Sequence, residues 1–394
     1  MINKNTKEYI ENKKAEGLYG ISFDAIEHPG LTLKDEIEYL GISQYQFAIK
    51  VGCTEQTISR IVNEREPITS DMAIRFETVF GGRPSAQFWN SMQKSYDIYH
   101  LKNEIEIKAE KEIGFFNQYL KNIFTELKHY NYIENINAHG KEAKVKSILE
   151  LKKYFGVSSF SNIFAEDNMK VAFRKYQREV KDDYAIAGWV RTGTLKALEL
   201  FSQEVIVPEY DSRRFIEKIV DLKKLSREDQ DFFLRKLKSE LFECGVLLIY
   251  LPGFKNTHIG GALKWIKSRP VIMLKTLKQR EDTFWFNLFH EIGHVVKHSK
   301  KEFFMDFDED NIDEKEQEAN AFAKEMLLPS LDTIAKEFKL LGDVDFGSKL
   351  ENVAKKNGVS VGILAGRLCK ELDGGARIWK QLGSYRKTID VMVI

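Results

Sequence analysis

Two histidines, His290 and His294, stand four residues apart in a segment rich in aromatic residues. The residues just before them, 284–289, are almost all apolar, which predicts a helix buried in a protein core. Positions four apart lie one above the other on a helix, so both imidazoles can bind one metal ion. Burying them together with Glu291 costs free energy unless these groups are paired or bind a ligand. The chain must therefore pack this helix and bring further ligands to it.

Glu291 completes the pattern His-Glu-x-x-His. It lies one step round the helix from His290, within reach of a water molecule held between the two histidines. We predict that Glu291 is a general base, which takes a proton from the attacking water and passes it to the leaving amine. The motif thus predicts hydrolysis of a peptide bond by a metalloendopeptidase.

The third ligand has to come from another part of the chain. A histidine six residues beyond the second one would define a metzincin, but Lys300 occupies that position. A helix predicted over residues 316–329 offers carboxylates instead. Glu316 and Asn320 share one face of it, so we predict Glu316 as the ligand and Asn320 as the hydrogen-bond partner of a ligating histidine. Glu318, which points about 200° away around the helix, is the alternative ligand.

Two histidines and one carboxylate leave a coordination position open, as in catalytic zinc sites. We therefore predict Zn²⁺, with another divalent metal such as Mn²⁺ as the alternative. His298, one further helical turn along, either hydrogen-bonds a ligand or simply lies near the negative end of the helix dipole. Tyr250, His298 and Arg367 are candidates for stabilising an oxyanion, and the sequence does not distinguish between them.

A second motif lies near the other end of the chain. Residues 44–51 form a short predicted helix between Ser43, a suitable N-cap, and Gly52, a suitable terminator. Thr54 then caps a second helix, and this spacing is typical of a helix-turn-helix. Phe47, Val51, Ile58 and Ile61 are the expected shared core. The residues predicted to contact DNA are Gln44, Thr54, Glu55, Gln56, Thr57, Ser59 and Arg60.

The charge of this segment argues against tight DNA binding by one copy. Residues 31–95 hold seven basic and eight acidic residues, a net charge of −1, whereas phosphate contacts dominate the affinity of most DNA-binding domains. The whole chain is also balanced, with 60 Lys+Arg against 59 Asp+Glu. We therefore expect a homodimer on an operator. The alternative is a helical module that contacts only protein.

Three short apolar runs, 245–252, 258–266 and 270–275, are the predicted strands. Helical periodicity dominates elsewhere, so the predicted fold is mostly α with a small α+β domain that carries a short twisted sheet. Gly260 and Gly261 lie in the second strand. Either they let an extended substrate pair closely with an edge strand, or they mark a bulge or turn. The predicted divisions are an extension (1–27), the helix-turn-helix domain (28–98), a helical connecting region (99–215) and the metallopeptidase domain (216–394).

No apolar run reaches the roughly 18 residues that a membrane helix needs, and the first residues are too polar for a secretory signal. The three cysteines, Cys53, Cys244 and Cys369, are far apart, which suits reduced thiols. We expect a cytoplasmic protein with no membrane partner.

At these motifs the chain resembles two known protein families. Residues 28–30, 41–44 and 48–63 resemble the helix-turn-helix of HigA-like antitoxins, a type of XRE helix-turn-helix. Much of the remaining chain resembles the ImmA/IrrE metallopeptidases. The matching segments are residues 154–157, 185–191, 245–246, 260–265, 284–286, 290–294, 298, 316–329 and 354–368.

The second resemblance implies a gluzincin-like fold, with His290, His294 and Glu316 as ligands and Glu291 as base. It also implies a stress- or phage-linked regulator that cleaves a repressor or antitoxin and so relieves repression. Here the helix-turn-helix is in the same chain, so the expected substrate is a separate repressor, a toxin–antitoxin partner or the chain itself. The alternative function is a repressor whose peptidase-like domain is a sensor without proteolysis.

Overall fold

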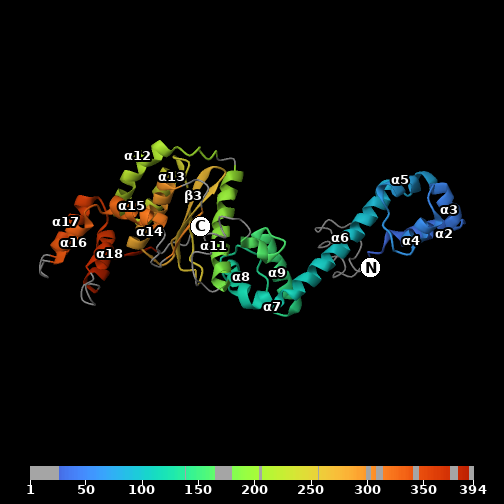
Figure 1. Ribbon diagram of the computed structural model, residues 1–394, viewed down its shortest axis with the longest axis horizontal. Coiled ribbons are helices and arrows are strands. Elements are labelled where there is room, and N and C mark those ends of the chain that lie inside the picture. Colours follow the sequence, from blue (N-terminus) through green and yellow to red (C-terminus); the bar gives the residue numbers. More distant parts are fainter. Residues whose placement is uncertain are drawn as a thin grey trace, which may run out of the picture. The chain divides into compact units, whose positions relative to one another are not determined.

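The computed structural model shows a chain of two compact units, residues 1–112 and 113–394 (Figure 1). The residues that the structure describes are 26–137, 139–164, 180–203, 206–255, 257–298, 303–307, 314–339, 346–372 and 380–389. Nearly all of the predicted extension 1–27 lies outside them. As predicted, the fold is mostly α with a small α+β domain.

The first unit is a cluster of helices around the residues of the predicted helix-turn-helix. Its helices are α2 (Pro29–Tyr39), α3 (Gln44–Val51), α4 (Glu55–Val62), α5 (Ser70–Val79) and α6 (Ala86–Lys111). Phe47, Val51, Ile58 and Ile61 are buried together, as expected from the spacing of the apolar residues. The caps explain why the helices are short. The Ser43 side chain and Gln46 form a reciprocal capping box, and Gly52 ends α3 at φ 76°, a left-handed conformation that favours glycine.

Helix α6 runs through the predicted domain boundary at residues 98 and 99, and the two units meet after Glu112 instead. The sequence changes from a mixed to a strongly charged pattern at this point, but no glycine or proline interrupts the helix. Beyond Lys111 the predicted helical connecting region continues as α7 (Ile113–Phe115), a π-helical turn (Phe116–Leu120) and α8 (Lys121–His129).

The second unit surrounds a four-stranded sheet of order β1-β3-β2-β5. Its strands are β1 (Leu247–Leu251), β2 (Ile259–Ile266), β3 (Arg269–Lys275) and β5 (Phe304–Phe307), and β4 (Gln279–Arg280) pairs with β6 (Thr388–Ile389). The remaining helices are α9 (Lys141–Phe155), η3 (Phe160–Phe164), α11 (Val180–Ser202), α12 (Ser212–Leu222), η4 (Lys223–Arg227), α13 (Gln230–Phe242), α14 (Glu281–Lys297), α15 (Glu314–Leu327), α16 (Leu331–Lys339), α17 (Phe346–Asn357) and α18 (Val361–Glu371).

Helices cover both faces of this sheet, which explains why its strands are continuous apolar runs. On β3, Ile272 and Leu274 belong to the core shared with α14. Met273 points the other way and lies against α11, where a Cβ on Gly193 would come within 2.5 Å of its sulfur. The Trp189 indole on α11 donates a hydrogen bond of 2.8 Å to the carbonyl of Pro252.

The strand that contains the two glycines is not an edge strand. β2 lies between β3 and β5, so the expectation that an extended substrate pairs directly with β2 is wrong. The register of β2 against β5 shifts between Ile259 and Gly261, which agrees with the alternative of a bulge. Residues 304–307 lack the length and the apolar pattern of a strong strand, so β5 was not expected from the sequence.

Helix α14 is the buried centre of the second unit. A Cβ on Gly293 would lie 3.1 Å from the Cα of Ala319, so this glycine and alanine let α14 and α15 approach closely. At its N-terminal end, Asp282 is only 4% exposed and accepts two hydrogen bonds, of 3.1 and 2.9 Å, from the Arg386 guanidinium. A buried ion pair thus ties the C-terminal segment to the first turn of α14. Among the described residues, no helix is long and apolar enough to cross a membrane.

Candidate functional site

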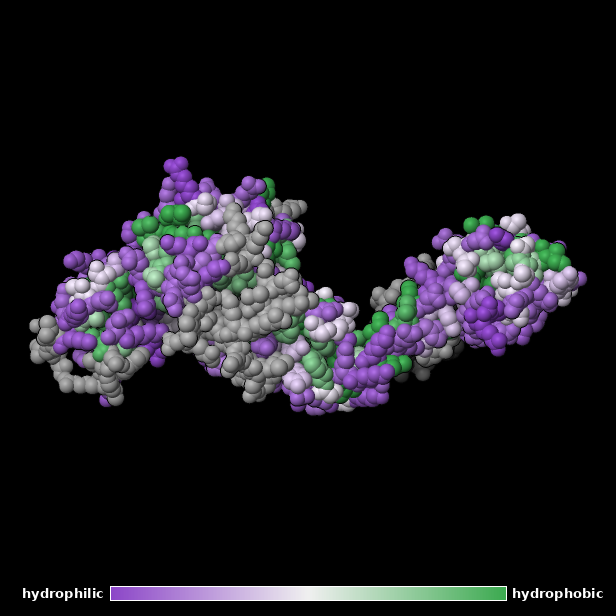
Figure 2. Space-filling model, viewed as in Figure 1, coloured by the Kyte–Doolittle hydropathy of each residue, from purple (hydrophilic) through white to green (hydrophobic). Residues whose placement is uncertain are grey.

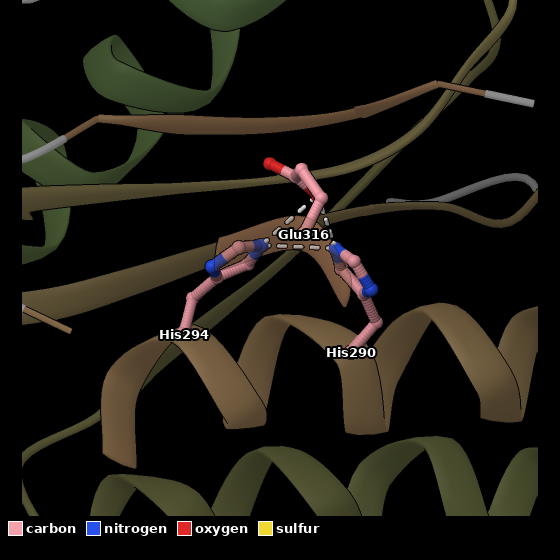
Figure 3. Close-up of side chains that lie close together, drawn as sticks. All are labelled: His290, His294 and Glu316. Atoms are coloured by element: carbon pink, nitrogen blue, oxygen red, sulfur yellow. Dashed lines mark hydrogen bonds and ion pairs between the residues drawn. The ribbon is translucent and has the colours of Figure 1, made fainter. Parts of the chain in front are cut away.

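The two motif histidines and one glutamate meet at a single point (Figure 3). His290 and His294 project from successive turns of α14, and Glu316 projects toward them from α15. The two Nε2 atoms are 2.9 Å apart, and Glu316 Oε2 lies 3.0 Å from His290 Nε2 and 3.4 Å from His294 Nε2. All three side chains are buried.

Hydrogen bonds on the far side of each ring determine which nitrogen faces this point. His290 Nδ1 donates to Asn320 Oδ1 at 3.0 Å, because an amide oxygen can only accept. His298 Nε2 lies 3.0 Å from Glu318 Oε2 and donates to it, which leaves His298 Nδ1 to accept from His294 Nδ1 at 2.9 Å. Both ligand histidines therefore turn an unprotonated Nε2 toward Glu316.

Three acceptor atoms crowded together need a cation between them, and this donor set fits zinc. Zinc binds imidazole nitrogen and carboxylate oxygen at about 2.0–2.2 Å, so tetrahedral ligand atoms are separated by roughly 3.3 Å. The separations of 2.9–3.4 Å at this site are close to that value. Within the described ranges of the chain, His290, His294 and Glu316 are the only residues that converge here, which leaves a coordination position for a substrate or water. Manganese would also accept these ligands.

The electrostatics of the site match a metal centre that works near neutral pH. Burial lowers the pKa of His294 to about 4, so its imidazole is neutral at pH 7. Burial alone would raise the pKa of Glu316, but the two imidazoles outweigh that effect and hold the pKa at about 2. Neutral histidines and an ionised carboxylate are the protonation states that bind a divalent cation.

The predicted alternative, Glu318, has a different position. Its carboxylate contacts His298 and is half exposed, whereas Glu316 faces both ligand histidines. His298 lies at the C-terminal end of α14 with its side chain buried against the ring of Phe304, 5.1 Å between centroids. The sequence did not indicate that Glu318 and His298 would form one hydrogen-bonded chain to a ligand.

Glu291 is fully buried beside the histidines and lies against the sheet. A Cβ on Gly261 of β2 would come within 2.6 Å of Glu291 Oε1 and 3.0 Å of its Cγ. Gly261 therefore leaves the space that the Glu291 carboxylate occupies. This contact is the structural reason for one of the two glycines, and it connects the sheet with the predicted general base.

Of the three candidates for oxyanion stabilisation, Tyr250 is poorly placed. Its hydroxyl donates a 2.9 Å hydrogen bond to the carbonyl of Leu234 on α13, within the core. The Arg367 guanidinium lies over the ring of Phe286, 4.9 Å from its centroid, and 3.8 Å from Glu371. His298 is occupied by the hydrogen bonds to His294 and Glu318.

A test of this arrangement is the exchange Gly261→Ala. The added methyl group displaces the Glu291 carboxylate but leaves the metal ligands in place. We expect cleavage to slow by at least about tenfold, the loss that follows misplacement of a general base, with zinc stoichiometry unchanged. Gly383→Ala is the matched control, since its Cβ would meet no atom within 4 Å. Equal cleavage rates for both variants would show that Gly261 does not position Glu291.

The predicted DNA-contacting residues lie on or beside α4. Glu55, Gln56 and Arg60 are exposed, and Thr57 and Ser59 are half-buried. Arg60 forms an ion pair of 2.7 Å with Glu66.

Two of these residues also hold the motif together. Thr54 caps α4 by accepting from the Thr57 amide at 3.1 Å, and Ser59 accepts from Asn63 at 3.3 Å. Gln44 is half-buried in the first turn of α3. Glu55, Gln56 and Arg60 thus offer the most accessible polar groups of α4.

Comparisons with known proteins agree with both halves of this description. Residues 243–369 match the family described as the IrrE N-terminal-like domain, Peptidase_M78. This segment contains the three candidate ligands and Glu291. No solved structure gives a significant match.

The relatives among curated proteins are similar to the N-terminal part. Virulence-associated protein I of Dichelobacter nodosus is 38% identical over 72 residues, which are 18% of this chain and 65% of that protein. Virulence-associated protein A' of the same organism is 31% identical over 82 residues, 21% of this chain and 70% of that protein. The uncharacterized HTH-type transcriptional regulator YddM of Escherichia coli (strain K12) is 24% identical over 85 residues, 22% of this chain and 88% of that protein.

The chain therefore spans just under two thirds of the first of these relatives and more of the others. The helix-turn-helix regulators match one part of the chain and the peptidase family matches another. On this evidence the chain belongs, through its N-terminal part, to the family of these virulence-associated proteins, and it carries a Peptidase_M78 (IrrE N-terminal-like) domain at residues 243–369, consistent with a helix-turn-helix fused to an ImmA/IrrE-type domain.

Proposed function

We propose that this protein is a DNA-binding regulator whose second unit is a zinc-dependent endopeptidase that cleaves a specific protein. The observation that carries the proposal is the meeting of His290, His294 and Glu316, with their Nε2 and Oε2 atoms within 3.4 Å of one another. The substrate we favour is a repressor or antitoxin, or the chain itself, in a stress- or phage-linked response.

In this proposal the residues have separate tasks. When bound, zinc supplies a Lewis acid at an open coordination position. Asn320 orients His290, and the chain of His298 and Glu318 orients His294. Glu291 accepts a proton from the attacking water and returns it to the leaving amine. Glu291 is fully buried beside the two histidines, and Gly261 leaves the space for its carboxylate, which supports this role.

The peptidase activity is tested with purified protein, supplied with zinc and incubated with repressors encoded beside its gene. We expect defined fragments with the wild type and none with Glu291→Gln, an exchange that keeps the shape of the side chain but removes the base. The chain alone, in the same buffer, shows whether it cleaves itself. Identical fragments from the wild type and Glu291→Gln would contradict the peptidase proposal and favour the alternative of a sensor without proteolysis.

We further propose that the first unit binds an operator as a homodimer through α4. The exposed positions of Gln56 and Arg60 support contact with base edges, and the name of one relative, the HTH-type transcriptional regulator YddM, supports a transcriptional role. The charge of −1 over residues 31–95 means that one copy gains little from phosphate contacts. Apolar surface along α6, where Ile98, Leu101 and Ile105 are about half exposed, is available for contact between copies (Figure 2).

The exchange Gln56→Ala is expected to weaken operator binding by at least about fivefold, the effect of losing about 1 kcal/mol at one base pair. Gln87→Ala, which removes another exposed glutamine, from α6, is the control and should bind like the wild type. Both are measured by gel shift on the promoter of the chain's own gene, with the mass of the complex giving the number of copies. Unchanged operator affinity in Gln56→Ala would show that α4 does not contact the DNA bases as proposed.

A further inference from the structure

A cavity of about 700 Å³ lies in the second unit, away from the metal centre. Its walls are α8, the π-helical turn before it and the segment that leads into α9. Three lysines line it: Lys121, Lys128 and Lys144. No aspartate or glutamate is among its lining residues, so the cavity has a strong positive charge at neutral pH.

These lysines do not have carboxylate partners within the described part of the chain. The Lys128 ammonium instead donates to two neutral acceptors, the Ile136 carbonyl at 3.1 Å and Asn137 Oδ1 at 3.4 Å. These two contacts hold the ammonium in position and leave its charge uncompensated. Asn131 and Asn135 add amide groups to the same wall. Fixed ammonium groups and amides in a concave site are the usual means of binding an anion.

Another cavity in the same unit is lined by basic side chains that are paired with acidic ones, and it serves as a comparison. It measures about 490 Å³ and lies between α12 and α13. There the basic groups are neutralised: Lys218 contacts Glu240 and Glu243, and Lys236 contacts Glu240 at 2.5 Å. The three lysines of the 700 Å³ cavity differ in that no aspartate or glutamate lines that cavity with them. Their arrangement is therefore not explained by an internal ion-pair network.

A third cavity of about 370 Å³ adjoins the first and shares Thr125 and His129 with it. It adds Lys255, Lys275 and Lys278, which come from the sheet side. The one carboxylate in its lining, Glu126, is only 8% exposed. Two adjoining basic cavities that share residues of α8 favour a ligand with more than one negatively charged group.

We propose that this basic site binds a small phosphorylated ligand that carries at least two phosphates, such as a nucleoside di- or triphosphate. A volume of about 700 Å³ lies within the usual range of ligand pockets, about 300–1,000 Å³. The lysines contact the phosphates, and the asparagine amides are available to the uncharged part of the ligand. The proposal is independent of proteolysis, because none of these residues belongs to the metal centre.

The test is isothermal titration of the full-length protein with inorganic pyrophosphate, with ATP and with adenosine. We expect pyrophosphate and ATP to bind and adenosine not to bind. The double variant Lys121→Gln/Lys144→Gln should bind ATP more weakly than the wild type. Each exchange should contribute a loss of at least about tenfold, the effect of losing one charge-assisted hydrogen bond. This pair leaves Lys128 and its two contacts intact, so the fold is retained, as circular dichroism would verify.

Lys236→Gln, in the neutralised cavity, is the matched control and should bind ATP like the wild type. Failure of the wild type to bind ATP and pyrophosphate at millimolar concentration would overturn the proposal. So would equal binding by the double variant. Binding of a short single-stranded oligonucleotide without binding of ATP or pyrophosphate would also overturn it, in favour of a nucleic-acid contact.

Discussion

Replacing Glu316 with glutamine is expected to lower the zinc affinity of this protein by more than about 100-fold. The carboxylate is the only anionic group among the three that converge, and its Oε2 lies 3.0–3.4 Å from both imidazole nitrogens. Its loss therefore removes both a ligand and the charge that balances the metal. The expected loss exceeds the 10–100-fold that outer-shell partners of a metal ligand typically contribute. Competition with a fluorescent zinc chelator measures it.

Glu318→Gln is the matched control, two residues along the same helix. Because Glu318 reaches the metal ligands only through His298, its exchange should reduce zinc affinity by about tenfold, within the outer-shell range. Cobalt-substituted protein provides a second measurement, since the visible spectrum reports the geometry of the ligands. The reverse order, with Glu318→Gln the more damaging exchange, would mean that Glu318 is the ligand.

Arg386→Met is expected to destabilise the second unit by about 3 kcal/mol, because it leaves Asp282 buried without its partner. Asp282 is 4% exposed and Arg386 15%, and the two hydrogen bonds between them join positions 104 residues apart. Methionine retains most of the arginine stem, so lost packing contributes little. Urea unfolding followed by tryptophan fluorescence measures the difference, since four of the five tryptophans belong to the sequence of this unit.

An exposed ion pair in the same unit gives the comparison. Arg213 contacts Glu217 one helical turn away, with the two side chains 90% and 67% exposed. Arg213→Met should change the free energy of unfolding by less than about 1 kcal/mol, because water and salt screen such pairs. If the two variants unfold at the same urea concentration, the Asp282–Arg386 pair contributes no more than a surface pair.

The parts of this fold that follow from local sequence were predictable. The caps Ser43 and Thr54 with the terminator Gly52 define the two helices of the helix-turn-helix within a few residues. His290 and His294 share a helical face whatever surrounds them, because the helix itself sets their spacing. The β1, β2 and β3 strands were also expected, since buried strands show continuous apolar runs.

The parts that depend on tertiary contacts were not predictable. Which of Glu316 and Glu318 faces the histidines depends on the rotation of α15 against α14, which the small residues Gly293 and Ala319 permit. The pairing of β5 with β2 places a strand where a substrate was expected to bind. The Asp282–Arg386 pair joins positions 104 residues apart in the sequence, so no local pattern reveals it.

The most direct measurement of the central claim is the rate of substrate cleavage during zinc titration of metal-free protein, with wild type and Glu291→Gln side by side. The account predicts that wild-type activity rises to a plateau at one zinc per chain. Glu291→Gln should bind the same amount of zinc with the same affinity and cleave nothing. Cleavage by wild-type protein that persists after chelation, or equal cleavage by Glu291→Gln, would contradict a zinc-dependent peptidase centred on His290, His294 and Glu316.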